Sequence, residues 1–449
     1  MLGAIFALAW PTMLEQLMQT AVQYIDTAMV GSLGTQATAA VGATTTINWL
    51  LLTTLSALGV GFLAYIARAC GAGEEGLVPR AAAQAALCVL VVGTLFTVVP
   101  LALSSRVPVW MQVDAPIRAL AGRYFYILYT PMLLRAAGIV FGTLLRAVGD
   151  TKTPMLVGVL VNLINVVLNF LFIYPTRTVS MLSCSFTLPG MGWGVEGAAA
   201  ASAIAYAAGG VCMTIALWRH PVLSPRGQSL RPDPEVLRPC LKVALPNMLQ
   251  RFGTSLGYVA FAAMINALGE VAAAAHTIAN TVESAFYIPG YGMQTAAATL
   301  AGNALGAQDK EQMRRLARMI LLLEVVLMVL SGGLLFVFAP HMMRLFSASA
   351  AVIGLGAAVL RMVAVSEPFY GVSIIIEGMM QGVGNTLTPF VCNIIGMWGV
   401  RIVGTFVCTR LLGMGLVSAW GCMIAHNLLL FVLFTILYLR GTWNPLYRK

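Results

Sequence analysis

Charge is what this sequence lacks most. Only 9% of its 449 residues are Asp, Glu, Lys or Arg, whereas a soluble domain carries about 25%. Hydrophobic residues make up 59% of the chain. Apolar stretches of about 20 residues or more recur from one end to the other, and no long polar segment separates them. This composition excludes a soluble globular domain and indicates an integral membrane protein.

Several motifs are absent, and each absence excludes a class of protein. The ten-residue alternation of outer-membrane barrel strands does not occur, so we expect the membrane spans to be helical. The four histidines stand far apart and the eight cysteines form no CxxC, which leaves no familiar metal motif. There is no Walker A sequence and no arrangement of nucleophile, base and orienting group. We therefore expect no cofactor, no enzymatic activity and no use of ATP.

Gly, Pro and charged clusters divide the chain into twelve apolar segments. Each is long enough to cross about 30 Å of hydrocarbon at 1.5 Å per residue. No basic segment with a small-residue cleavage site precedes the first of them, so we expect it to be retained. The sequence predicts an all-α integral membrane protein with twelve transmembrane helices. They cover approximately 3–31, 37–69, 80–111, 117–146, 153–175, 192–218, 235–268, 271–304, 311–339, 350–384, 388–411 and 415–439.

The basic residues are distributed unequally between the predicted loops. If the N-terminus lies in the cytoplasm, sixteen of the 26 Lys and Arg residues fall in cytoplasmic loops and helix ends, and six fall on the opposite side. This bias follows the positive-inside rule and predicts that both termini are cytoplasmic. It also explains the net charge of +10 without any binding of nucleic acid.

The two halves of the chain repeat each other. RAVGDTKTP at 146–154 matches QGVGNTLTP at 381–389, and Pro11 matches Pro246 at the same spacing, which we call the repeat offset. Because each repeat holds six spans, the halves share one orientation and are related by an axis along the membrane normal. We expect two six-helix lobes, 1–218 and 235–449, joined by a cytoplasmic linker at 219–234. This architecture is typical of transporters.

The first span carries a stripe of polar residues. On an α-helix, five residues fall on one face about 100° wide: Asp26, Gln23, Gln19, Glu15 and Thr12. That face cannot point to lipid, since an Asp at mid-membrane costs roughly 2.5–3.5 kcal/mol. We expect Glu15, Gln19 and Gln23 to line a substrate cavity and Asp26 to be functional. The alternative for Asp26 is a structural carboxylate that an amide satisfies.

The fifth span carries a second stripe, formed by Asn162, Asn165 and Asn169, which fall within about 60° of each other. Their amides can donate hydrogen bonds to a carboxylate, and a carboxylate in such a site can take a proton or a sodium ion. We also place Asn162 in the substrate cavity. Pro11 is expected to kink the first span, either as a functional hinge or as a passive bend.

Charged residues also occur inside the spans of the second half. Glu283 stands where Asn48 stands in the first half, and both are candidates for the substrate cavity, with structural pairing as the alternative. The other spans of the second half hold too many charged residues for all of them to lie unpaired in lipid. We expect ion pairs that hold the C-terminal lobe together, with a gate or an anion-sensitive site as the alternative. The residues concerned are Arg251, Glu367, Glu377 and Arg401.

Four stretches of the sequence are similar to the multidrug and toxic compound extrusion (MATE) family, and this resemblance covers the whole chain. It looks closer to the DinF-like branch, whose acidic residue lies in the first span, than to the NorM-like branch. The stretches are WPTMLEQLMQTAVQYIDTAMVGSLG, GTLLRAVGDTKTPMLVGVLVNLINVVLNFLFI, GVEGAAAAS and HTIANTVESAFYIPGYGMQTAAATLAGNALGAQD.

The resemblance implies an antiporter with two lobes that rock between outward-open and inward-open forms. A proton or sodium ion enters while an organic, mostly cationic compound leaves. Asp26 matches the family's acidic residue in the first span, Asn165 and Asn169 match its polar pair in the fifth, and Ser202 matches a hydroxyl residue in the sixth. A sodium ion would then bind at Asp26, Asn165 and Asn169.

The sequence thus predicts an exporter of organic cations that is a monomer, with its spans in the cytoplasmic membrane of a prokaryote. The alternative is a flippase for lipid-linked oligosaccharides, which has the same superfamily architecture. A flippase needs cationic residues in its cleft to hold pyrophosphate. Arg251 and Arg401 leave this open, while the acidic stripe of the first span argues against it.

Overall fold

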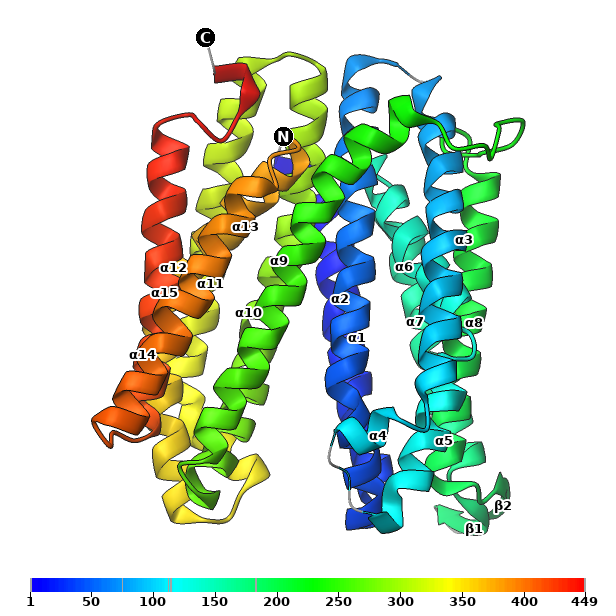
Figure 1. Ribbon diagram of the computed structural model, residues 1–449, viewed down its shortest axis with the longest axis vertical. Coiled ribbons are helices and arrows are strands. Elements are labelled where there is room, and N and C mark those ends of the chain that lie inside the picture. The colour runs from blue at the N-terminus through cyan, green and yellow to red at the C-terminus, as the bar shows by residue number, and fades with distance from the viewer. Residues whose placement is uncertain (1, 75, 112, 114, 182–183, 448–449) are drawn as a thin grey trace.

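The computed structural model describes residues 2–447 apart from 75, 112, 114 and 182–183, and it leaves out the side chains of 35, 43, 46 and 177–188. The chain forms an elongated bundle of long helices (Figure 1). In its first half the elements are α1 (Leu2–Gly31), α2 (Thr35–Ala72), α3 (Leu77–Leu103), α4 (Val107–Trp110), the 3₁₀ turn η1 (Ala115–Ile117), α5 (Arg118–Tyr129), α6 (Met132–Ala147), α7 (Lys152–Phe172), β1 (Pro175–Met181), β2 (Cys184–Met191) and α8 (Gly194–Arg219).

The second half begins after a stretch without helix, residues 220–233. Its elements are α9 (Pro234–Asn266), α10 (Glu270–Gly306), α11 (Lys310–Phe346), α12 (Ala350–Gly382), α13 (Leu387–Ile394), the π-helical η2 (Ile395–Ile402), α14 (Val403–Phe406), the π-helical η3 (Val407–Leu411), α15 (Leu416–Leu439) and the 3₁₀ turn η4 (Pro445–Tyr447).

Each of the twelve predicted spans coincides with a long helix, with the bent pair α5–α6, or with the continuous run from α13 to η3. Within the part of the chain that the structure describes, eight helices and the bent pair are long and apolar enough to cross a membrane. The helices α1, α9 and α10 are 30, 33 and 37 residues long but fall short of that apolarity. We infer that these three helices face protein or water more than lipid.

Two features differ from the expected helices and loops. The fourth span bends by 50° between α5 and α6. The bend falls at Thr130 and Pro131, where the proline lacks an N–H and disfavours helical geometry in the residue before it. The segment between the fifth and sixth predicted spans forms the antiparallel hairpin β1–β2.

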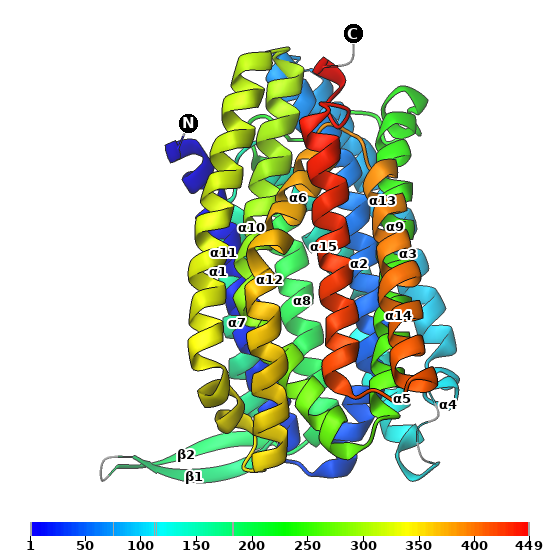
Figure 2. The ribbon, with the colours of Figure 1, turned by 90° about the vertical axis from the view of Figure 1, so that its left-hand side faces the viewer.

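The helices gather in two groups, α1–α8 and α9–α15, which we call the N-lobe (2–219) and the C-lobe (234–447) (Figure 1). Both chain termini and the connection between the lobes lie at one end of the bundle, which we call the termini end (Figure 1). The β1–β2 hairpin lies at the opposite end, which we call the hairpin end (Figure 2).

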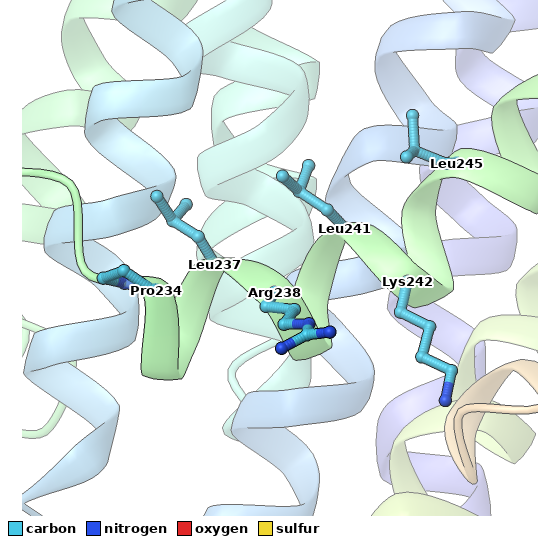
Figure 3. Close-up of a pocket in the computed structure, with 6 residues that line it drawn as sticks. All are labelled: Pro234, Leu237, Arg238, Leu241, Lys242 and Leu245. Carbon is cyan, nitrogen blue, oxygen red and sulfur yellow. The ribbon is translucent and has the colours of Figure 1, made fainter.

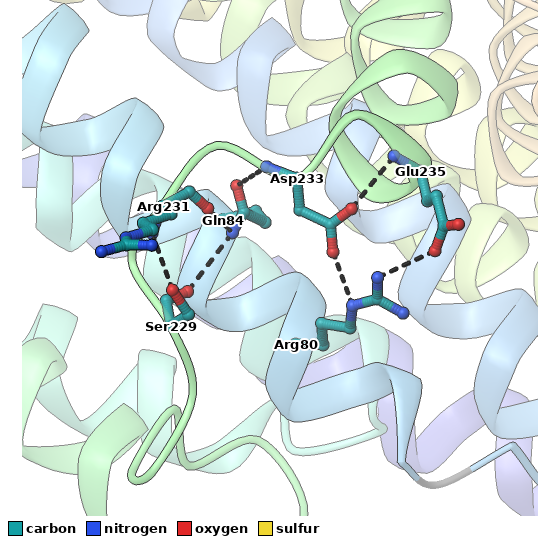
Figure 4. A network of polar contacts seen from close by, with 6 residues as sticks. All are labelled: Arg80, Gln84, Ser229, Arg231, Asp233 and Glu235. Atoms are coloured by element: carbon teal, nitrogen blue, oxygen red, sulfur yellow. Dashed lines mark hydrogen bonds and ion pairs between the residues drawn. The ribbon is translucent and has the colours of Figure 1, made fainter.

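A polar network fixes the connection between the lobes to α3 (Figure 4). The guanidinium of Arg80 contacts the carboxylates of Asp233 at 2.5 Å and Glu235 at 2.8 Å. The side chain of Gln84 donates to the carbonyl of Arg231 at 2.9 Å and accepts from the N–H of Asp233 at 3.1 Å. Asp233 also caps α9, because its carboxylate accepts from the N–H of Glu235. The start of α9 is therefore held against the N-lobe.

The lobes touch where α2 crosses α10, through glycines that leave no room for a side chain. A Cβ atom on Gly71 would lie 2.0 Å from the carbonyl oxygen of Asn303, and one on Gly306 would lie 2.0 Å from that of Arg68. The repeat offset relates Gly71 to Gly306 and Arg68 to Asn303, so the two contacts are equivalent. The pseudo-two-fold axis predicted from the sequence therefore passes between α2 and α10.

The first turns of α1 and α9 extend this contact. Ile5 and Ala9 of α1 belong to the buried cluster of the C-lobe, and Cys240 and Ala244 of α9 belong to that of the N-lobe. The repeat offset again relates these pairs. Towards the hairpin end α9 diverges from α2 (Figure 1), and Trp49 of α2 is 54% exposed. The backbones of the lobes thus pack against each other at the termini end, while nearer the hairpin end the hydroxyl of Tyr24 in α1 donates to the carbonyl of Thr281 in α10 at 3.0 Å.

We expect Gly71→Ala to separate the lobes at the termini end, because the added methyl group would collide with the backbone of α10. The buried thiol of Cys240 should then react faster with a maleimide. Mass spectrometry of the labelled protein would measure this rate for Cys240 alone.

Gly42→Ala is the matched control. Gly42 lies in the same helix, and nothing stands within 4 Å of the Cβ position. Equal labelling of Cys240 in the wild type and in the Gly71→Ala variant would contradict the proposed role of this crossing.

Candidate functional site

Asp26 of α1 lies close to three further residues of the predicted site, Asn165 and Asn169 of α7 and Ser202 of α8. The side-chain amide of Asn169 donates to the Oδ1 atom of Asp26 at 2.5 Å. In the orientation that satisfies its neighbours, the amide nitrogen of Asn165 lies 2.8 Å from Oδ1 and 3.2 Å from Oδ2 of Asp26, and its oxygen accepts from the hydroxyl of Ser202 at 3.0 Å. Asp26 is half-buried, and the other three residues are buried.

No positive charge neutralises this carboxylate. Five ion pairs occur among the residues that the structure describes, and none of them includes Asp26. The Oδ1 atom of Asn169 is buried without a partner. The site therefore offers two carboxylate oxygens, two amides and a hydroxyl, which are groups that bind a proton or a hard cation.

The rest of the polar stripe on α1 divides into two parts. Gln19 and Gln23 are exposed. Glu15 is buried, and its carboxylate forms an ion pair with Arg146 of α6 at 2.6 Å. On α7, Asn162 is buried and its amide nitrogen has no partner. The structure thus joins Glu15 to α6 and leaves the two glutamines accessible.

The C-lobe has a counterpart of this ion pair without the arginine. The repeat offset relates Glu15 to Gln250 and Arg146 to Gln381. Both glutamines donate to the carboxylate of Glu377, at 2.8 and 3.0 Å, and Asn393 donates to it at 3.3 Å. At these equivalent positions, the N-lobe therefore has an acid paired with a cation. The C-lobe has an acid paired with amides.

The predicted ion pairs of the C-lobe are wrong for the residues that the structure describes. None of Arg251, Glu367, Glu377 and Arg401 belongs to the five ion pairs. Amides satisfy Glu377, and the guanidinium of Arg401 stands 4.3 Å from the ring centre of Phe261 and 4.8 Å from that of Tyr258. Ring faces attract a cation without a carboxylate, so Glu377 and Arg401 have partners other than each other.

Pro11 lies inside α1, which continues through it. The missing N–H frees the carbonyl of Ala7, and the hydroxyl of Thr151 donates to this carbonyl at 3.2 Å. Thr386, the counterpart of Thr151 at the repeat offset, donates at 2.7 Å to the carbonyl of Val243 near Pro246. The repeated motif therefore places a threonine against the backbone next to each proline. A hinge at Pro11 stays a prediction.

Sequence reasoning missed Arg135 of α6. This buried guanidinium donates to the side chain of Asn48 at 2.9 Å and lies 3.8 Å from the ring centre of Tyr206. A cation inside a span next to Pro131 was a signal that could have identified it. Glu283, the counterpart of Asn48, is buried and interacts electrostatically with Arg401.

A surface hollow of about 500 Å³ lies away from this site, along the first turns of α9 (Figure 3). One face of a single helix lines it, and this face combines leucines with two cations. Such a face is typical of a helix at the membrane surface. The hollow is lined by Pro234, Leu237, Arg238, Leu241, Lys242 and Leu245.

We expect Arg146→Met to destabilise the protein by about 3–5 kcal/mol, because it leaves the buried carboxylate of Glu15 without its partner. Thermal unfolding in detergent would measure the loss. The double variant Glu15→Gln with Arg146→Met should recover most of it. Additive losses in the double variant would show that the pair contributes nothing.

The family model MatE matches this chain twice, at residues 11–171 and 246–407. The two matches begin at positions that the repeat offset relates, so they reproduce the internal repeat. A probable multidrug resistance protein NorM from Thermotoga maritima is 27% identical over 97% of this chain and 92% of its own length. A probable multidrug resistance protein YoeA from Bacillus subtilis is 24% identical over 91% of this chain and 87% of its own length.

Solved structures share the fold. A transporter of the MOP superfamily from Pyrococcus furiosus, whose binding pocket is described as reversed in polarity, superposes with a TM-score of 0.90 at 24% identity. A multidrug resistance MATE family transporter in an outward-facing conformation gives 0.90 at 23% identity. Each comparison covers 99% of this chain and 96% of the other.

The two-lobed helical fold predicted from the sequence is confirmed, while the choice between the DinF-like and NorM-like branches stays a prediction. With both repeats matched and the fold shared along its whole length, the chain belongs to the MatE family, the multidrug and toxic compound extrusion family of multi-pass membrane transporters.

Proposed function

We propose that this protein is a secondary active antiporter that exports organic, mostly cationic compounds in exchange for a proton or a sodium ion. The observation that carries the proposal is the environment of Asp26, whose carboxylate is held by the amides of Asn165 and Asn169 and by no cation. The names of the relatives in Thermotoga maritima and Bacillus subtilis support multidrug efflux.

The asparagines suit a group that gains and loses a small cation. When Asp26 is ionised, both amides donate N–H groups to it. When Asp26 is protonated, its O–H needs an acceptor, and the unpartnered oxygen of Asn169 can supply one. A sodium ion would instead take oxygens from Asp26, Asn165 and Asn169 as ligands. Occupancy by a cation thereby changes how α1 is bonded to α7.

The free energy released when one coupled cation enters is large enough to drive export of a substrate. One charge that crosses 100 mV is worth about 2.3 kcal/mol, and about 1.4 kcal/mol corresponds to a tenfold concentration ratio. One cation can therefore drive a substrate some tens-fold against its gradient.

The excess of basic residues in one set of loops supports cytoplasmic termini, in the cytoplasmic membrane of a prokaryote. The termini end would then be the cytoplasmic end. Since the backbones of the lobes pack together there and α9 diverges from α2 towards the hairpin end (Figure 1), the conformation would be outward-open. We propose that the protein works as a monomer without a cofactor.

The flippase alternative needs cations that can reach a pyrophosphate. Arg401 is 3% exposed and lies against Tyr258 and Phe261, so its guanidinium is not offered to a cleft. Arg251 alone is partly exposed. This arrangement favours the antiporter.

Asp26→Asn should abolish export driven by an ion gradient, because an amide can neither bind a proton nor balance a sodium ion at neutral pH. Uptake of a fluorescent organic cation into proteoliposomes, under a pH gradient and a sodium gradient imposed separately, would measure this and identify the coupling ion. Glu196→Gln, at a partly exposed glutamate of α8 paired with Arg123, is the control. Export by the Asp26→Asn variant at the wild-type rate would remove Asp26 from the mechanism.

Arg251→Met with Arg401→Met should leave the export of organic cations intact, because methionine keeps much of the apolar volume while both charges are removed. The same proteoliposome assay would measure export, and a fluorescent lipid-linked sugar in the same vesicles would report flipping. Loss of sugar flipping, with no cation export in either protein, would favour the flippase instead.

A further inference from the structure

The C-lobe contains two buried acids that nothing neutralises. Glu324 of α11 is 0% exposed, and neither of its carboxylate oxygens has a hydrogen-bond partner. Glu367 of α12 is 1% exposed, and its Oε2 atom has no partner. Neither residue belongs to an ion pair within the described part of the chain.

Two neighbouring helices leave room for the carboxylate of Glu324. A Cβ atom on Gly290 of α10 would lie 2.7 Å from its Oε1 atom, and one on Gly371 of α12 would lie 3.0 Å from the same atom. Gly290 follows Pro289 directly, and Gly371 comes three residues after Pro368. The space around the carboxylate thus lies next to the prolines of both helices, where a helix bends most easily.

The acids form a line across three helices. Glu367 interacts electrostatically with both Glu324 and Glu283, and Glu283 of α10 interacts with Arg401. All three acids are buried. Among the described cations of the C-lobe, Arg401 is the one that interacts with these acids, and the acid concerned is Glu283.

An ionised carboxylate buried without a hydrogen bond or a counter-ion carries a large desolvation cost, and a neighbouring carboxylate adds repulsion. A neutral carboxylic acid at Glu324 would avoid both costs.

We propose that Glu324 and Glu367 form a second proton-binding site, inside the C-lobe and separate from Asp26. Glu324 takes a proton from hydronium, leaving water, and returns it through Glu367 and Glu283 when the packing of α10 and α12 around it opens. Chains of acids inside a membrane commonly relay protons. The role of this proton in transport rests on the antiport proposed above, whereas its binding does not.

Infrared spectroscopy of the purified full-length protein tests the binding step. The C=O absorption of a protonated carboxylic acid should be present at neutral pH in the wild type and should decrease when a transported organic cation is added. Glu324→Gln should lose the part of this band that Glu324 contributes, while protonated Glu367 and Asp26 would still absorb. Glu311→Gln, at an exposed residue of the same helix paired with Arg315, is the control and should keep it. An unchanged band in Glu324→Gln would mean that Glu324 is ionised and would overturn the proposal.

Transport by the same variants tests the exchange step. Glutamine imitates the protonated acid in shape but cannot release a proton, so Glu324→Gln and Glu367→Gln should fold and lose proton-driven export. Size-exclusion chromatography would report folding. Wild-type export by folded Glu324→Gln would show that its proton is only structural and would overturn the proposal. If the proposed coupling role of Asp26 were wrong, the Asp26→Asn variant would export normally, and the infrared result for Glu324 would not change.

Discussion

The crossing of α2 and α10 is the contact on which the arrangement of the lobes depends. Gly71 and Gly306 bring the two backbones together, and small residues at such a crossing are the usual means by which membrane helices approach closely. Because one axis relates the two contacts, the lobes cannot slide past each other there without breaking both. α9 diverges from α2 towards the opposite end (Figure 1), and Asp26 lies in the part of α1 nearer that end, close to Tyr24, which is bonded to α10.

The two lobes share a scaffold and differ in chemistry. At the repeat offset, Asp26 corresponds to Phe261 and Asn169 to Gly404. The C-lobe therefore has an aromatic ring and a position without a side chain where the N-lobe has a carboxylate and its amide. Its own unpaired acids, Glu324 and Glu367, lie on other helices. A duplicated fold thus supplies the symmetry needed for two lobes to rock, while substitution at equivalent positions gives each lobe a different ion chemistry.

Much of the fold could be predicted because its signals are local. Apolar runs mark the spans, and matching motifs reveal the repeat. The meeting of Asp26 with Asn165 and Asn169 could also be predicted, since two polar stripes that avoid lipid have few other places to go. The partner of Glu15 could not be predicted, because helical periodicity shows which face a residue occupies and not which helix faces it. The C-lobe pairs were wrong for a related reason. Amides and rings compete with opposite charges as partners, and only the packed structure shows which partner is near.

The threonines of the repeated motif connect the prolines to the movement that transport requires. Thr151 holds the carbonyl that Pro11 frees in α1, and Thr386 holds a carbonyl of α9 near Pro246. A change in the bend of either helix must exchange such a hydrogen bond, at a net cost of about 0.5–1.5 kcal/mol. That cost is below the roughly 2.3 kcal/mol that one charge gains across 100 mV. In the antiport proposed above, these bonds would be strong enough to hold one conformation at rest and weak enough for a single coupled cation to replace it with another.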